Sequence, residues 1–184
     1  MTRKIWQQRQ SIPLGQVYGL LEPGPVILLT TAARGQADVM TQSWHMMVEF
    51  EPPLVACVVS GRNHSFELLR ASGECGINIP TVALAQQVVD CGNTSGREVD
   101  KFAHFGLATF PAREIAVPLL AGCYANLECR VADETLVDAY NLFILEVVAA
   151  WRDDSQVDPR TLHHQGWGSF RVDGEVIHLP SKMK

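Results

Sequence analysis

Two polar segments, far apart in the sequence, carry side chains of the kind that bind anions. They are residues 60–65 (SGRNHS) and residues 95–101 (SGREVDK). Guanidinium and ammonium groups form charge-assisted hydrogen bonds with phosphate oxygens. Asn63 is expected to cap a helix, and the free N–H groups that follow it would also attract an anion. We expect both segments to converge on one phosphate, near Arg62 and Lys101.

Residues 40–44 (MTQSW) suit a flat aromatic ring that is linked to such a phosphate. Trp44 could border the ring, and Met40 and Phe102 could close its edges. Simple core packing is the alternative for each apolar side chain, as solvated loops are for the arginines. The neighbouring His45 could donate to a ring carbonyl, although a structural, hydrogen-bonded histidine is the favoured interpretation. Taken together, the segments predict a site for an anionic, aromatic cofactor.

Other chemistries lack their sequence signatures. The chain contains no G-x-G-x-x-G, no G-x-x-x-x-G-K-[ST] and no G-x-S-x-G motif, and its five cysteines form no C-x-x-C pair. Cys57 and Cys129 are expected in the core. The adjacent His163 and His164 would point to opposite faces of an extended segment, so we expect no metal site there. No side chain is assigned a catalytic role.

Composition favours one ordinary globular domain covering residues 1–184. Apolar residues make up 47% and charged residues 19%, and the net charge is −5. This charge gives no reason to expect binding to nucleic acid. The apolar runs are too short for a membrane helix, and the N-terminus lacks the apolar core of a signal peptide. An odd number of cysteines without a disulfide pattern fits a reducing compartment, so we expect a cytoplasmic protein.

Many short apolar runs with few helices favour a mainly-β barrel with helical insertions. A strand at 54–59 is apolar throughout and is expected at the centre of the sheet. A helix should begin at Asn63 and end at Gly73. The remaining elements are expected as a hairpin at 26–41, strands at 75–79, 126–131 and 141–151, and a helix at 82–91 between Thr81 and Gly92.

Turn residues shape two further expectations. Pro111 and Pro118 should discourage regular strand pairing within residues 93–125. Asp173 and Gly174 are expected to form the turn of a hairpin at 169–178, because Asp-Gly is a strong hairpin signal.

Several motifs, in this order, resemble the flavin reductase-like, flavoredoxin-type family of FMN-binding split barrels. They lie at residues 23–31, 40–44, 52–53, 62–65, 77–78 and 100–102. The likeness spans residues 18–180 and leaves 1–17 as an N-terminal extension. It implies a mainly-β, FMN-binding split β-barrel that forms a homodimer, with FMN near the subunit interface. It also implies that NADH, NADPH or a protein donor passes electrons through FMN to free flavin or another acceptor, such as a partner monooxygenase.

The resemblance also implies a set of cofactor-binding residues, with the flavin N5 rather than a side chain carrying the chemistry. Lys101 is expected as the second cation at the phosphate. The full set is Met40, Thr41, Ser43, Trp44, Ser60, Arg62, Asn63, Ser65, Asn78, Ser95, Gly96, Lys101 and Phe102.

Two positions depart from the family pattern. Asp38 stands where relatives often carry asparagine, and we expect its side chain to point outward, away from a phosphate. Tyr140 stands where relatives that reduce free flavin often carry a histidine near the nicotinamide. One alternative is therefore an electron carrier of the flavoredoxin type that does not oxidise NAD(P)H directly. Another alternative is a barrel that binds haem through an axial histidine.

Overall fold

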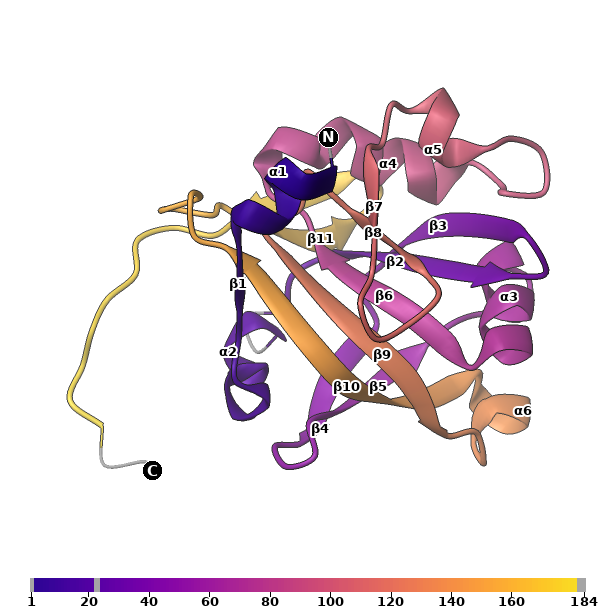
Figure 1. Ribbon diagram of the computed structural model, residues 1–184, viewed down its shortest axis with the longest axis horizontal. Helices are drawn as coiled ribbons and strands as arrows, with labels where there is room; N and C mark the ends of the chain where they lie inside the picture. Colours follow the sequence, from indigo (N-terminus) through magenta and orange to yellow (C-terminus); the bar gives the residue numbers. More distant parts are fainter. Residues whose placement is uncertain (1, 22–23, 182–184) are drawn as a thin grey trace.

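The computed structural model describes residues 2–21 and 24–181, which are built around one eight-stranded antiparallel sheet (Figure 1). The strand order is β3-β2-β6-β9-β10-β5-β4, and β1 pairs with the C-terminal end of β10, whereas β5 pairs with its N-terminal half. This mainly-β architecture confirms the predicted fold class. The strands are β1 (Arg9–Ser11), β2 (Ile27–Ala33), β3 (Gln36–Gln42), β4 (His45–Glu49), β5 (Leu54–Val58), β6 (Glu74–Ile79), β9 (Ala125–Asp133) and β10 (Leu142–Asp153).

Helices flank strand β3, where the candidate residues lie. Helix α3 (His64–Ser72) packs on β2 and β3, while α4 (Ala85–Asn93) and α5 (Lys101–His104) pack against β3 (Figure 1). Helix α3 ends at Gly73, whose φ of 69° is left-handed, as the sequence predicts. Helix α4 starts after a 3₁₀ turn, η2 (Val82–Leu84), and continues through Gly92 to Asn93. The expected stop at Gly92 is therefore wrong by one residue.

The largest core cluster fills the interior of the barrel that the main sheet forms. Most of its members come from β2, β6, β9 and β10, and they include Leu29, Ile77, Leu127 and Leu145. Each of these side chains is fully buried. Their removal from water is the main favourable term for folding. A second cluster, which includes Leu28, Val88 and Cys91, packs helix α4 on the outer face of β2 and β3.

Strand β5 is not the central strand that its apolar sequence predicts. It is second from the end of the sheet order, between β10 and β4. Its middle residues Val55 and Cys57 are buried because the barrel wall curves around the core, whereas Leu54 and Val58 are partly exposed. The uninterrupted apolar run of β5 therefore predicted its burial correctly but not its position in the sheet.

The segment between α5 and β9 contains a strand pair where the prolines predicted none. Strands β7 (Thr109–Pro111) and β8 (Pro118–Leu120) pair, with Pro111 opposite Pro118. The prediction is wrong because each proline lies at the terminal position of a three-residue ladder, where its missing N–H removes no interior ladder bond. The loop between them is fixed instead by the buried carboxylate of Glu128.

The C-terminal hairpin turns earlier than predicted. Strands β11 (Leu162–Gly166) and β12 (Ser169–Val172) are joined at Gly166, Trp167 and Gly168, whose φ values are 96°, 54° and 72°. The expected Asp-Gly turn does not form, because Asp173 accepts a hydrogen bond from Thr161 Oγ1 at 2.9 Å. The chain from Gly174 to Ser181 then runs away from the body without regular structure (Figure 1).

The N-terminal segment is integrated into the sheet. After α1 (Thr2–Gln7), strand β1 places the buried Arg9 near Asp153 and within 2.8 Å of the Ala121 carbonyl. A 3₁₀ turn, η1 (Leu14–Gln16), and α2 (Tyr18–Leu21) follow, and Ile12 and Val17 join the main core. Pro23, which begins one of the family motifs, lies outside the described residues, as does Met1 of the predicted extension. None of the described helices has the length and apolar character needed to span a bilayer.

Replacing Glu128 with alanine tests how the strongest buried polar contact supports the fold. The carboxylate is fully buried and accepts hydrogen bonds from Arg113 N, Glu114 N and Trp151 Nε1, the last at 2.7 Å. Because three donors would lose their acceptor, we expect the free energy of unfolding to fall by about 3 kcal/mol in urea titrations. The exposed Glu134→Ala is the matched control. Equal stability of the two variants would contradict the assignment.

Candidate cofactor site

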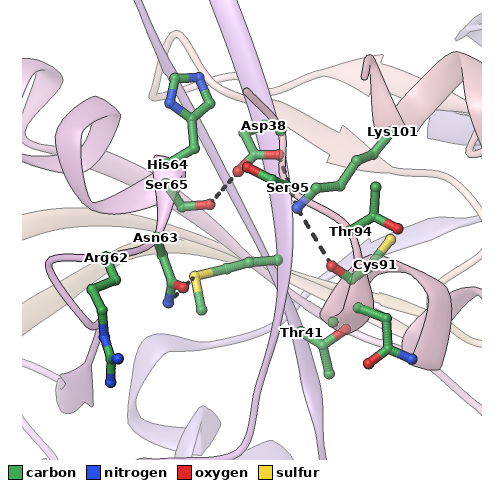
Figure 2. Close-up of a pocket in the computed structure, with 14 residues that line it drawn as sticks. Asp38, Thr41, Arg62, Asn63, His64, Ser65, Cys91, Thr94, Ser95 and Lys101 are labelled. Carbon is green, nitrogen blue, oxygen red and sulfur yellow. Dashed lines mark hydrogen bonds and ion pairs between the residues drawn. The ribbon is translucent and has the colours of Figure 1, made fainter. Parts of the chain in front are cut away.

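Strand β3, the start of α3 and the loop after α4 meet at a polar cavity of about 280 Å³ (Figure 2). We call it the polar cavity. The two polar segments singled out in the sequence thus lie together, and Arg62 and Lys101 both line this space. The lining side chains and glycines are Asp38, Met40, Thr41, Arg62, Asn63, His64, Ser65, Cys91, Gly92, Asn93, Thr94, Ser95, Gly96 and Lys101.

A second cavity, of about 420 Å³, adjoins the first and has an aromatic rim. We call it the ring cavity. The two cavities share Met40, Thr41, Arg62 and Asn63, so they are direct neighbours. The ring cavity adds Gln42, Ser43, Trp44, Val58, Ser60, Tyr140 and Asn141. Every predicted cofactor-binding residue except Asn78 and Phe102 lines one cavity or both.

Asn78 and Phe102 support the site from inside the fold. Asn78 is fully buried, donates to the Leu28 carbonyl at 2.9 Å and accepts from Leu120 N and from Asn126 Nδ2. Its amide is therefore fully engaged between strands. Phe102 packs on the second core cluster beneath α4. Both residues hold the strands and helices that frame the cavities, and the structure does not place them among the cavity residues.

The start of helix α3 faces the polar cavity. Asn63 occupies the N-cap position with an extended backbone, but its side chain makes no capping bond and instead donates to Met40 Sδ at 3.7 Å. The expected side-chain cap is therefore wrong. Phe66 N donates to the Asn63 carbonyl at 3.2 Å, whereas the preceding N–H groups of His64 and Ser65 have no acceptor one turn earlier within the helix, and the helix dipole adds partial positive charge there. This end of α3 is suited to an anion.

Arg97 joins the two polar loops. Its guanidinium donates to the Arg62 carbonyl at 3.0 Å and pairs with Glu67 at 2.7 Å. This pairing lowers the pKa of Glu67. Both loops have the sequence Ser-Gly-Arg. In each loop the backbone N–H of the arginine donates to the serine Oγ, and the N–O distance is 3.3 Å in the first loop and 3.2 Å in the second. Arg97 is therefore a link between the two loops.

Asp38 points into the site, and the expectation that it points outward is wrong. Its Oδ2 accepts from Ser65 Oγ at 2.6 Å, and its Oδ1 lies 3.1 Å from Lys101 Nζ. The carboxylate is buried together with Lys101 because the opposite charge offsets the loss of hydration. A Cβ on Gly96 would lie 2.2 Å from Asp38 Oδ1, so only glycine lets this loop pass the carboxylate.

Asn141, which sequence reasoning did not assign to the site, fixes the first loop from the other side. It has a left-handed backbone, with φ of 56°, at the end of α6 (Val137–Tyr140), and its Oδ1 accepts from Gly61 N at 3.1 Å. Asparagine tolerates this conformation well. The contact joins residues 80 positions apart, so no local pattern in the sequence could have revealed it.

Other polar groups near the site have structural roles. His45 Nε2 bonds to the Pro25 carbonyl at 2.8 Å, and burial lowers the pKa of His45. Burial raises the pKa of the Cys91 thiol to about 11, so it is protonated at neutral pH. Cys57 and Cys129 are in the core, as predicted. Within residues 2–21 and 24–181, His, Cys, Asp and Glu form no group suited to a metal ion.

Comparisons with known proteins agree with this geometry. Residues 20–170 match the family model described as "Flavin reductase like domain". The uncharacterized protein YddH of Escherichia coli is 34% identical over 182 residues, covering 90% of this chain and 95% of that protein.

Solved structures show the same fold. The FMN-binding domain of a flavin reductases-like enzyme from Shewanella baltica has a TM-score of 0.88 and 28% identity, covering 94% of this chain and 97% of that one. Flavoredoxin from Methanosarcina acetivorans has a TM-score of 0.73 and 28% identity, covering 86% and 89%. The predicted split-barrel fold class is thereby confirmed.

Removal of the Arg97 side chain tests whether it holds the two loops together. In Arg97→Ala we expect amide hydrogen exchange at residues 95–99 to rise by about tenfold, because the contacts to Arg62 O and Glu67 are lost. Global stability should change by less than about 1 kcal/mol, because the ion pair is solvent-exposed. Arg160→Ala is the control. Unchanged exchange in this loop would refute the assignment.

Proposed function

This chain belongs to the flavin reductase-like family, and we propose that it is an FMN-binding oxidoreductase. In this proposal it takes hydride or electrons from NADH or NADPH and delivers them to free flavin or to another acceptor. The observation that carries the proposal is the convergence of Arg62, the start of α3 and the Ser95 loop on one polar cavity that adjoins the ring cavity.

The chemistry of the two cavities fits FMN. A phosphate monoester needs positive charge and N–H or O–H donors, which Arg62, the first turn of α3 and the Ser95 hydroxyl supply at the polar cavity. A three-ring system needs apolar surface and edge donors. The ring cavity offers Met40, Val58 and Trp44 for the first requirement and hydroxyl groups for the second.

When bound, FMN supplies the hydride and electron chemistry. The residues of this chain bind and orient it. Arg62 attracts the phosphate, Met40 and Thr41 lie between the two cavities, and Trp44 and Tyr140 border the ring cavity. Among the described residues that line the two cavities, none is assigned a role as general acid or base, so the protein contributes binding and orientation.

We also propose that the protein forms a homodimer through the surface of strand β4. Met46 and Val48 on this strand and Trp44 just before it occupy alternate positions, and the exposed fractions of Trp44, Met46 and Val48 are 71%, 63% and 47%. An apolar stripe on a strand at the end of the sheet order is typical of a protein contact. Trp44 also borders the ring cavity, so a second copy packed on this stripe would help to enclose the cofactor.

A carrier of the flavoredoxin type is the second candidate. Tyr140 favours it, because this exposed residue borders the ring cavity where relatives that reduce free flavin often have a histidine. Such a carrier would exchange electrons with a protein partner and would not react with pyridine nucleotides. Both candidates share the FMN site and differ only in the electron donor.

Titration of FMN into the protein tests the binding site. We expect flavin fluorescence to be quenched saturably, and Arg62→Ala to weaken FMN binding by up to about tenfold, because a charge-assisted contact is lost. Arg160→Ala, which changes the same charge outside the cavities, should bind like wild type. If FMN at millimolar concentration causes no quenching, the proposed function is wrong.

Anaerobic stopped-flow mixing tests the electron donor. With the FMN-loaded protein, we expect NADH or NADPH to bleach the flavin absorbance within seconds. Dithionite serves as the control reductant, since it should bleach the flavin whichever candidate is correct. If dithionite bleaches the flavin and neither nucleotide does, the reductase assignment fails and the carrier replaces it.

A further inference from the structure

The polar cavity contains a buried carboxylate as well as positive charge. Asp38 and Lys101 lie beside each other at the cavity, with exposed side-chain fractions of 2% and 3% (Figure 2). A carboxylate repels a phosphate that approaches the same space. Its presence therefore changes which groups are available to an anionic ligand.

Lys101 is fully engaged by the protein. Its ammonium group donates to the Val39 carbonyl at 2.6 Å and to the Cys91 carbonyl at 3.4 Å, and it faces Asp38 Oδ1 at 3.1 Å. An ammonium group has three N–H bonds, and three oxygen atoms surround this one. Lys101 thus neutralises Asp38 and ties β3 to α4. It has no donor left for a phosphate.

The Ser65 hydroxyl is engaged in the same way. Its proton goes to Asp38 Oδ2 at 2.6 Å, so this side chain can no longer donate to an anion. Arg97 is bound to Glu67 and to the Arg62 carbonyl. Of the other basic residues that line the cavity, His64 has its Nδ1 3.6 Å from Glu67 Oε2, so within the part of the chain that the structure describes Arg62 is the lining cation without an ion-pair partner. A phosphate of charge about −2 would meet this one cation and a set of neutral donors.

We propose that Asp38 makes the polar cavity a weak, rapidly exchanging phosphate site, so that FMN comes and goes as a ligand and is not retained as a permanent prosthetic group. The proposal rests on the proposed function and adds to it how the site handles its ligand. Asp38 acts through Lys101 and Ser65, which it withdraws from the phosphate. It is a specificity-determining residue of the site.

Asp38→Asn tests this directly. Asparagine has almost the same shape, removes one negative charge and leaves the positive charge of Lys101 uncompensated. Its amide can donate to Ser65 Oγ, which frees the hydroxyl proton for a ligand. We expect FMN to bind at least about tenfold more tightly and to dissociate correspondingly more slowly, as one additional charge-assisted bond implies. Riboflavin, which lacks the phosphate, should change by less than about twofold.

The control is Asp158→Asn, which makes the same change of charge at an exposed position outside the two cavities. It should bind both ligands like wild type. The proposal is overturned if Asp38→Asn fails to tighten FMN or if it tightens riboflavin equally. In that case the proposed function stands, provided that wild type still quenches FMN fluorescence. If neither protein binds FMN, both proposals fall.

The affinities of the wild-type protein for FMN and riboflavin test the same proposal without relying on the folding of a variant. We expect its affinity for FMN to exceed its affinity for riboflavin by no more than about tenfold, because a single free cation meets the phosphate. Desalting should also remove bound FMN within minutes. Retention of stoichiometric FMN through exhaustive dialysis would overturn the proposal, as would an FMN preference above a thousandfold.

Discussion

The buried contact between Asp38 and Lys101 is the constraint on which the site depends. A charge removed from water must be matched by an opposite charge and hydrogen bonds, or the fold loses several kilocalories per mole. Ser65 at the start of α3 donates to Asp38 on β3, and the Cys91 carbonyl at the end of α4 accepts from Lys101. These contacts form only if β3, α3 and α4 keep one relative position. The polar cavity exists where these elements are held.

Around this contact, the structure uses backbone as much as side chains. The loops at Ser60 and Ser95 are closed by their own serines and joined by Arg97, while Gly96 permits the close approach to Asp38. The helix start then presents N–H groups that need no further adjustment to meet an anion. A site of this kind can be rigid yet weak, because its strongest charges are already paired within the protein.

The sequence was sufficient for features that depend on neighbours along the chain. Apolar runs identified strands such as β5 and β6, and Gly73 marked the end of α3. The sequence did not predict features that depend on a contact with a residue far away along the chain. Glu128 holds the loop between Pro111 and Pro118, and Thr161 holds Asp173 where the sequence predicted a turn. Likewise, neither the inward direction of Asp38 nor the engagement of Asn78 between strands has a local signal.

The central claim is that an FMN phosphate lies beside Arg62 and the start of α3 while the pair of Asp38 and Lys101 stays intact. A crystal structure of the protein grown with excess FMN tests it most directly. The account predicts phosphate oxygens within hydrogen-bonding distance of the Arg62 guanidinium and the first-turn N–H groups of α3, with Lys101 Nζ still beside Asp38. A phosphate bound directly to Lys101 Nζ, with that pair separated, would contradict it.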